Sequence, residues 1–282
     1  MNFSGSIFPL TMPLEFDGPQ QKAIAHVHGP MLVLAGAGTG KTTVLVERIT
    51  RLLREKHATA GEIRAVTYTD NSAADIRRKV QERLPGVDCS KLRASTFHAY
   101  CFNLLHANGN GFGVVDNADL WIFLRRNLSE LRLERFIKAA NPGEFLRDLI
   151  DFCSRCRDEL VTAADYRSYI DRVHRGELPL PRAGKSSEAL SHSEVLARCD
   201  ELARVYETVE HLLASRNYGT FGDMILRAVA LLRGNAGVLE RERATAKFIL
   251  IDEFQDSNTA QIELAALLGG EEQSVFAVGD PD

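Results

Sequence analysis

The sequence has no strong excess of either charge. Its 34 lysines and arginines stand against 38 aspartates and glutamates, which leaves a formal net charge of −4 over 282 residues. This balance excludes a chain that binds nucleic acid through overall basicity, and it also excludes a disordered acidic chain. Any contact with nucleic acid must therefore come from a local basic or stacking surface.

Cysteine is scarce and long apolar runs are missing. Five cysteines at irregular spacing argue against a disulfide framework and favour free thiols in a reducing compartment. Cys153 and Cys156 form a CxxC pair, but no second pair at matching spacing accompanies it, so a metal site there is not expected. The N-terminus lacks a secretory pattern, and no run could span a bilayer. We expect a cytoplasmic protein with no membrane partner.

What the sequence does have is an alternation of short apolar runs with amphipathic stretches. The runs MLVLAG, IRAVTYT, LRASTFH, KFILIDEF and SVFAVGD begin at residues 31, 63, 92, 247 and 274. Helical patterns follow the first four: TTVLVERITRLLREK, SAADIRRKVQERL, AYCFNLLHA and TAQIELAALL. Strands of such continuous apolar character are typical of a parallel sheet covered on both faces. The alternation predicts an α/β fold with right-handed crossovers.

The stretch 110–205 has a different character. It contains helical patterns such as GEFLRDLIDFCSRCRDEL and no convincing strand. Because candidate sheet strands lie on both sides of it, we expect an all-helical insertion within the α/β domain. The predicted organisation is a first part of the α/β domain at 1–109, the insertion at 110–205 and the second part at 206–282.

The run MLVLAGAGTGKT at 31–42 predicts a phosphate-binding loop. Glycines let backbone N–H groups converge on phosphate oxygens, the following helix N-terminus adds positive potential, and the lysine reaches the β- and γ-phosphates. The alternative is a flexible turn with a solvated lysine, but the loop follows an apolar strand and opens an amphipathic helix, as the cradle requires. The residues expected to bind the nucleotide are Ala35, Gly36, Ala37, Gly38, Thr39, Gly40, Lys41 and Thr42.

A second chemical element is FILIDEFQD, which begins at residue 248. At the end of a buried strand beside the loop, Asp252 could hold Mg²⁺ together with Thr42, while Glu253 polarises the attacking water. An acidic pair after a strand could equally cap the next helix. Its combination with the loop favours the catalytic interpretation, because both halves of a magnesium site then lie at strand ends of one sheet.

These two motifs closely resemble those of the UvrD, PcrA and Rep group of superfamily 1 DNA helicases, in the forms AGAGTGKT and DEFQDSN. Further matches follow in the family's order: FDGPQQKAI from 16 resembles its glutamine motif, VTYTDNSAADI from 66 its motif Ia, STFHAYC from 95 its motif Ib and VGDPD from 278 the start of its motif III. FGDMIL from 221 resembles a segment ahead of motif II. The helical middle corresponds in position to the family's inserted subdomain 1B.

The resemblance implies a RecA-like domain that binds ATP and Mg²⁺ and couples ATP hydrolysis to unwinding. It implies that Gln20 recognises adenine, and that Lys41, Asp252, Glu253 and Gln255 form the catalytic set. It also implies contact with single-stranded DNA, or with a junction of single and double strands. The residues implied in that contact are Tyr68, which would stack on a base, and Thr69, Thr96 and His98.

Alternatives to these DNA contacts stay open at the level of sequence. Tyr68 could be an ordinary strand aromatic packed in the core, and His98 a hydrogen-bonded structural histidine. Two other functions also stay open: a phosphate-loop ATPase with a different output, such as a kinase or a regulator, and a non-catalytic module that binds ATP or DNA.

The sequence departs from the family pattern in three places. Thr43 stands where the family has an arginine that helps hold adenine, and Thr220 precedes FGDMIL where an acidic residue is usual. The sequence also ends at Asp282, within motif III, so the second RecA-like domain and its arginines are not in it. Because such an arginine contributes about 10³ to 10⁵ in rate, we expect this chain alone to hydrolyse ATP slowly at best.

Overall fold

A five-stranded parallel sheet forms the centre of the computed structural model, which describes residues 15–136, 142–181, 190–270 and 274–281. All neighbouring strands run parallel. In spatial order the strands are β1 (Met31–Leu34), β7 (Val275–Gly279), β6 (Phe248–Ile251), β2 (Ile63–Thr67) and β3 (Arg93–Thr96). Each lies in one of the five predicted apolar runs, and the predicted α/β fold is confirmed.

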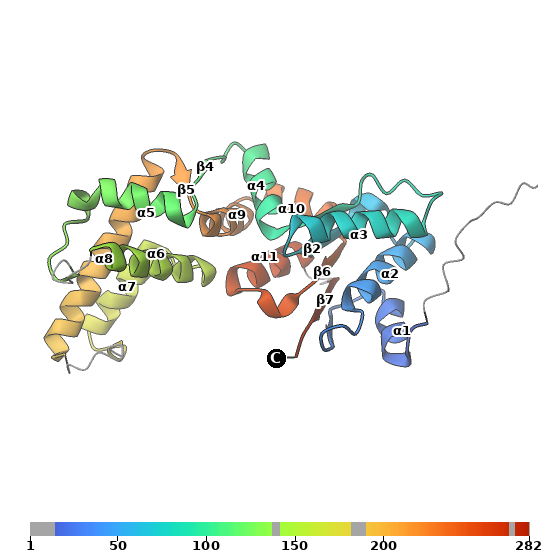
Figure 1. Ribbon diagram of the computed structural model, residues 1–282, viewed down its shortest axis with the longest axis horizontal. Coiled ribbons are helices and arrows are strands. Elements are labelled where there is room, and N and C mark those ends of the chain that lie inside the picture. The colour runs from blue at the N-terminus through green and yellow to red at the C-terminus, as the bar shows by residue number, and fades with distance from the viewer. Residues whose placement is uncertain (1–14, 137–141, 182–189, 271–273, 282) are drawn as a thin grey trace, which may run out of the picture.

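Helices cover both faces of this sheet (Figure 1). One core lies under α1 (Gly18–Ala25), α2 (Lys41–Arg54) and α3 (Asp70–Arg83). The other lies under α4 (Phe97–Ala107), α9 (Phe221–Gly234), α10 (Ala236–Ala244) and α11 (Thr259–Gly269). Successive side chains of a strand point to opposite faces, so Leu250 of β6 enters the first core while Ile249 and Ile251 enter the second.

Strand β1 is an exception to the expected covering of both faces. Met31 and Val33 pack against the first core, but Leu32 and Leu34 on the opposite face are 52% and 58% exposed. The physical reason is position: β1 is an edge strand with β7 as its one neighbour in the described sheet, and neither leucine belongs to the second core. The apolar pattern alone does not distinguish such an edge from a central strand.

The helical insertion forms the opposite end of an elongated molecule (Figure 1). Its helices pack around a third core, to which α8 (His192–Ala214) contributes Tyr206, Leu212 and Leu213. The predicted boundary between residues 205 and 206 therefore falls inside α8, which continues to Ala214. The helices are α5 (Asn117–Arg126), α6 (Pro142–Asp158), α7 (Ala163–His174) and α8 (His192–Ala214).

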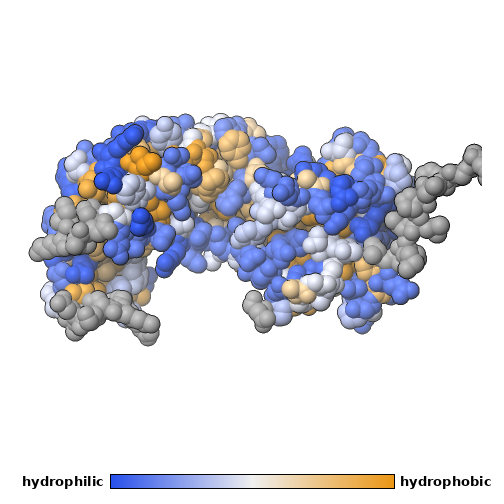
Figure 2. Space-filling model, in the orientation of Figure 1, coloured by the Kyte–Doolittle hydropathy of each residue, from blue (hydrophilic) through white to orange (hydrophobic). Residues whose placement is uncertain are grey.

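Two very short strands join the insertion to the α/β body. β4 (Gly113–Val114) and β5 (Tyr218–Gly219) pair in parallel, one at each end of the insertion. They add a strand pair at its base that the helical patterns do not predict. The outline of the molecule narrows where insertion and body meet (Figure 2).

The cysteines and the helix lengths are the last features of the fold. All five cysteines are free, and Cys153 and Cys156 lie on α6 against the third core. Burial raises the pKa of Cys153 to about 12 and that of Cys156 to about 11, as for inert core thiols. Within the described ranges, no helix has the length and apolar character needed to cross a bilayer.

Candidate active site

The glycine-rich loop connects β1 to α2 at the carboxyl end of the sheet. Gly38 and Gly40 have φ values of 77° and 86°, a left-handed conformation that residues with a Cβ rarely adopt. A Cβ built on Gly36 or Gly38 would meet no atom within 4 Å, so the loop borders open space. Gly40 caps α2 without a side-chain hydrogen bond, which leaves the first N–H groups of the helix available to an anion.

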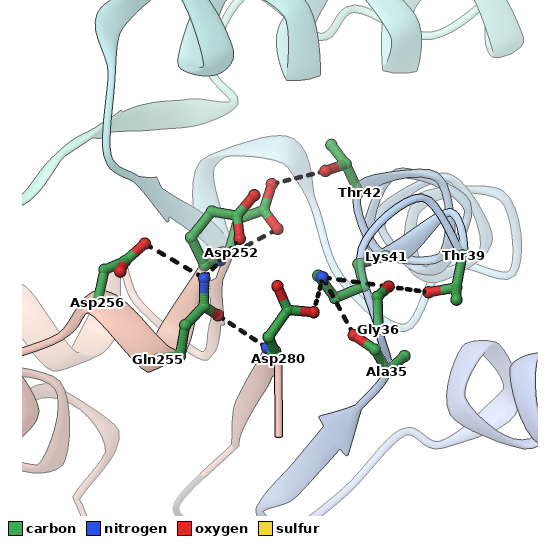
Figure 3. Close-up of polar contacts among 10 residues, drawn as sticks. Ala35, Gly36, Thr39, Lys41, Thr42, Asp252, Gln255, Asp256 and Asp280 are labelled. Atoms are coloured by element: carbon green, nitrogen blue, oxygen red, sulfur yellow. Dashed lines mark hydrogen bonds and ion pairs between the residues drawn. The ribbon is translucent and has the colours of Figure 1, made fainter. Parts of the chain in front are cut away.

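Lys41 lies folded over this loop (Figure 3). Its Nζ is 2.5 Å from Asp280 Oδ1, and it also donates to the carbonyl oxygens of Ala35 and Gly36 at 3.1 and 3.4 Å. The hydrogen bond to Asp280 is the main cause of a raised Lys41 pKa, so the lysine keeps its charge. Asp280 follows β7, the sheet neighbour of β1. The charge expected to meet phosphate is thus held by an internal carboxylate.

Thr42 and Asp252 face each other across the same edge of the sheet. Thr42 Oγ1 donates to Asp252 Oδ2 at 2.9 Å, and Asp252 is 4% exposed at the end of β6. Burial raises the pKa of Asp252, and the hydrogen bond from Thr42 opposes that shift. The described residues contain no group of three or more acidic, histidine or cysteine side chains that could hold a metal. A hydroxyl and a carboxylate nevertheless suit Mg²⁺, which takes few protein ligands and completes its shell with phosphate oxygens and water.

Glu253 and Gln255 form the next part of the site: Glu253 is the N-cap of the 3₁₀ helix η4 (Phe254–Asp256), and Gln255 lies within that helix. Glu253 has a φ of 54°, a left-handed conformation that turns the chain sharply after β6. Gln255 Nε2 donates to Glu253 Oε2 at 2.9 Å, and Gln255 Oε1 accepts from the backbone N–H of Asp280 at 2.9 Å. Gln255 therefore links Glu253 to the backbone of Asp280, the residue whose carboxylate holds Lys41 (Figure 3).

Gln20 reaches the loop from α1. Asp17 and Gln20 form a capping box at the start of that helix, and Gln20 Nε2 donates to the carbonyl oxygen of Thr39 at 3.1 Å. The glutamine is thus anchored beside the loop, as recognition of an adenine would require. Thr43 lies in the first turn of α2, where its Cβ is 3.8 Å from the position a Cβ on Gly40 would take.

The residues predicted to contact DNA line one cavity. Tyr68, Thr69, Thr96 and His98 line a space of about 460 Å³ together with Phe221 and two further α4 side chains, Phe102 and Asn103. Tyr68 and Phe221 are 51% and 49% exposed, and the rings of His98 and Phe221 meet edge to face at 5.6 Å. Half-exposed aromatic rings beside a cavity offer stacking surfaces. Tyr68 is therefore not packed in the core.

The other three predicted DNA residues have structural partners as well. The hydroxyls of Thr69 and Thr96 accept the N-cap hydrogen bonds of α3 and α4, from Ser72 N and Ala99 N. Burial lowers the pKa of His98, so the imidazole is neutral at pH 7. A neutral ring is suited to hydrogen bonding or stacking more than to pairing with a phosphate charge.

Sequence reasoning gave no role to two aromatic residues of this cavity. Phe221 opens α9 in the segment FGDMIL, and Phe102 lies one turn after His98 on α4, with a 40% exposed ring. The only signal for either is its place near a recognised motif. Exposure of an aromatic ring at a cavity is a property of the folded chain and is not visible in the pattern.

Tyr68 stands between this cavity and the nucleotide side. Tyr68 and Thr69 also line a second space of about 500 Å³, shared with Thr42, Asp252 and Glu253. The Tyr68 hydroxyl donates to the backbone carbonyl of Asp256 at 2.5 Å. One side chain thus borders both sites and is bonded to the η4 turn.

A phosphate loop between the first strand and first following helix of a parallel sheet, facing an acidic strand end, defines a RecA-like P-loop domain. Residues 17–282 match the UvrD/REP helicase N-terminal domain, and the chain belongs to that family. The resemblance inferred from the motifs is therefore confirmed.

Relatives of known description share this region. The chain is 31% identical over 268 residues to the ATP-dependent DNA helicase Rep of Salmonella typhimurium and 27% identical over 267 residues to the ATP-dependent DNA helicase PcrA of Staphylococcus aureus. It is also 27% identical over 263 residues to a probable DNA helicase of Mycoplasma pneumoniae. Each match covers 93% of this chain, but only 35%, 33% and 45% of the respective relative.

Proposed function

We propose that this chain is the ATP-binding part of a translocase that moves along single-stranded DNA and couples ATP hydrolysis to unwinding. The observation that carries the proposal is the position of Tyr68. Its half-exposed ring borders a cavity lined by aromatic residues, and its hydroxyl is bonded to the turn that follows Asp252 and Glu253. A kinase or a nucleotide-dependent regulator has no use for stacking surfaces bonded to its acidic turn.

The nucleotide roles follow from the chemistry of the side chains. Lys41 would exchange Asp280 for the β- and γ-phosphates, because a phosphate offers more charge than one carboxylate. Thr42 and Asp252 would hold Mg²⁺, which supplies neutralisation of phosphate charge when bound. Glu253, held by Gln255, would orient and polarise the attacking water, and Gln20 would contact the adenine edge. Thr43 in place of the family's arginine predicts weaker selection of the base.

The DNA role rests on stacking more than on charge. Tyr68 and Phe221 would each stack on a base of the single strand, and every base offers a π-face, so this contact does not depend on sequence. Thr69 and Thr96 would donate hydrogen bonds to the strand while still accepting their N-cap bonds, and the neutral His98 would donate from its ring N–H. A junction between single and double strands is the expected substrate of the complete motor.

The charge that develops on the transferring phosphoryl group needs an arginine, which we propose comes from a second RecA-like domain. The chain spans between a third and a half of the relatives it matches, which supports this division. An arginine of this kind contributes about 10³ to 10⁵ in rate. The 282-residue chain should therefore bind nucleotide while turning it over slowly.

The test is the rate of ATP hydrolysis with and without an oligo-dT strand, for this chain and for the product of the complete reading frame. We expect DNA to stimulate the complete product, and Lys41→Ala to abolish the stimulated rate. Lack of stimulation in the complete product would overturn the helicase proposal in favour of a regulatory ATPase or a binding module. An equal rate in the 282-residue chain would contradict the contribution of a second domain.

A further inference from the structure

The C-terminal end of α6 contacts the α/β body through several side chains. We call residues 157–160 the α6 anchor. Arg157, buried in the insertion next to Tyr206, donates through Nε to Asp223 of α9 at 2.6 Å. Leu160, in a left-handed conformation with φ 57°, packs against the second core of the body. Both contacts join the end of the insertion to the α/β body through α9 and the second core.

The two remaining residues of the α6 anchor, Asp158 and Glu159, bind the start of α11. Asp158 Oδ1 accepts from Asn258 Nδ2 at 2.7 Å, and Glu159 Oε2 accepts from Thr259 Oγ1 at 2.8 Å. Both partners lie at the start of α11, directly after the turn that carries Glu253 and Gln255. Figure 1 shows the end of α6 facing α11. Asp158 and Glu159 therefore bind the end of a functional turn.

Residues 253–258, the acidic turn, are contacted from three sides. Gln255 bonds Glu253 and Asp280 on the nucleotide side, and Asp256 accepts the Tyr68 hydroxyl on the DNA side. Asn258 bonds Asp158 on the side of the insertion. A displacement of any one contact changes the position of a turn only six residues long. One short segment thus has hydrogen bonds to the nucleotide, DNA and insertion sides.

We propose that Asp158 and Glu159 are positioning residues that transmit the orientation of the helical insertion to the acidic turn, and so set the coupling between nucleotide and DNA binding. This inference rests on the proposed function, since it needs both ligands to bind. It goes beyond it by assigning a role to the insertion, and to two carboxylates that line neither the DNA cavity nor the space beside Thr42 and Asp252, although Asp158 lies close enough to His98 to interact with its charge.

The cost of burial supports a dedicated role for Asp158. Burial raises its pKa, and the bond from Asn258 offsets this only in part. A partly buried carboxylate gains less free energy from a neutral amide than from a cation. An apolar side chain would fill the same space without the desolvation cost of the carboxylate, so packing alone does not account for Asp158. The hydrogen bond between Asp158 and Asn258 fixes the orientation of its two partners, which an apolar contact would not do.

The experiment compares the affinity of this chain for a fluorescent oligo-dT strand with and without a non-hydrolysable ATP analogue and Mg²⁺. The ratio of the two dissociation constants is the coupling factor, for which values of roughly 5 to 150 are typical of linked sites. The main variant is Asn258→Ser with Thr259→Val. Serine retains the N-cap of α11, while both donors to the α6 anchor are lost.

Asp158→Asn is the conservative variant, because its amide oxygen still accepts from Asn258. Asp148→Ala is the matched control, because Asp148 is an exposed carboxylate on the same helix, away from the α6 anchor. We expect the main variant to lower the coupling factor at least about three-fold towards 1, with each ligand alone bound within two-fold of the original affinity. Asp158→Asn and Asp148→Ala should keep the factor.

Three outcomes would overturn the proposal: an unchanged factor in the main variant, a factor of 1 in the unaltered chain although both ligands bind, or an equal loss of both separate affinities. The last would show that the contacts serve the fold alone. If the unaltered chain binds neither ligand, the proposed function is wrong, and the coupling proposal is wrong as well. The single-ligand measurements therefore distinguish a failure of the proposed function from a failure of the coupling alone.

Discussion

Lys41 and Asp280 form an ion pair of 2.5 Å between the phosphate loop and the end of β7, across 239 positions of sequence. The pairing joins the two strands that adjoin in the sheet, β1 and β7, at their carboxyl ends. It also places a negative charge where a nucleotide would put its own. The carboxylate of Asp280 therefore competes with phosphate for the same ammonium group.

Replacement of Asp280 by asparagine tests this competition. We expect Asp280→Asn to tighten the binding of an ATP analogue roughly two- to five-fold, because the partly exposed pair no longer has to be separated and a repulsive charge is removed. A fluorescent ATP analogue titrated into each variant gives the dissociation constants. Lys41→Ala, as the control, should weaken binding. Weaker binding by Asp280→Asn would mean that the carboxylate supports nucleotide binding.

The raised pKa of Asp252 predicts a pH dependence of the response to Mg²⁺. Only the ionised carboxylate binds the metal, and burial makes Asp252 take up its proton at a higher pH than the ordinary value of 3.8. The gain in ATP affinity caused by Mg²⁺ should thus decline on acidification before free aspartate would titrate. Titrations of nucleotide at several pH values, with and without Mg²⁺, measure this gain, and Asp252→Asn should show none at any pH.

The raised pKa of Asp252 also predicts how the stability of the fold depends on pH. A carboxyl group whose pKa is raised by folding stabilises the folded chain below its unfolded pKa, and that contribution is lost as pH rises through the folded pKa. At neutral pH the ionised Asp252 therefore lowers the free energy of unfolding. We expect Asp252→Asn to unfold at no lower temperature than the unaltered chain at pH 7. A clear fall in Tm would contradict the assignment of burial as the main cause of the shift.

Tyr68 combines a ring and a hydroxyl whose roles can be separated. Tyr68→Ala removes the stacking surface and should weaken oligo-dT binding by about 1 to 3 kcal/mol, or roughly five- to 150-fold. Tyr68→Phe keeps the ring and loses only the bond to Asp256, so its affinity for DNA should stay within about two-fold. Fluorescence anisotropy measures both. Equal losses in the two variants would show that the hydroxyl, and not the ring, supports binding.

The strands and the loop could be predicted from sequence because their signals are local. β2 and β6 are fully buried, so each reads as an apolar run, and the left-handed turns at Gly38 and Gly40 require glycines at fixed spacing. The approach of Thr42 to Asp252 also follows, because parallel strands end at one edge of a sheet. These features depend on a few neighbouring residues and on one topological rule.

The rest depends on contacts between distant residues and has no local signal. Nothing near Asp280 predicts that it holds Lys41, and two-residue strands such as β4 and β5 are too short to show a pattern. Leu32 reads as a core residue, although the edge position of β1 exposes it. The ends of α6 and α11 meet through Asp158 and Asn258, which lie 100 positions apart.

The buried pair of Arg157 and Asp223 is another contact between distant residues, and it joins the insertion to the α/β body. Their side chains are 2% and 7% exposed, and Asp223 also accepts from the N–H and hydroxyl of Thr220 at the start of α9. Arg157→Met would leave a carboxylate buried without its cation, at a cost of about 3 to 5 kcal/mol in unfolding free energy. Denaturant unfolding followed by circular dichroism measures that loss.

A second substitution distinguishes the lost charge from lost packing. In Arg157→Met with Asp223→Asn, the amide oxygen still caps α9 while the unpaired charge is gone, so a large part of the stability should return. Asp223→Asn alone should cost less than Arg157→Met alone, because an arginine at the domain junction can move its guanidinium towards water more easily than the short aspartate can move its carboxylate. If the double variant is as unstable as Arg157→Met, packing of the arginine stem against Gly222 is the larger contribution, and the charge pair the smaller one.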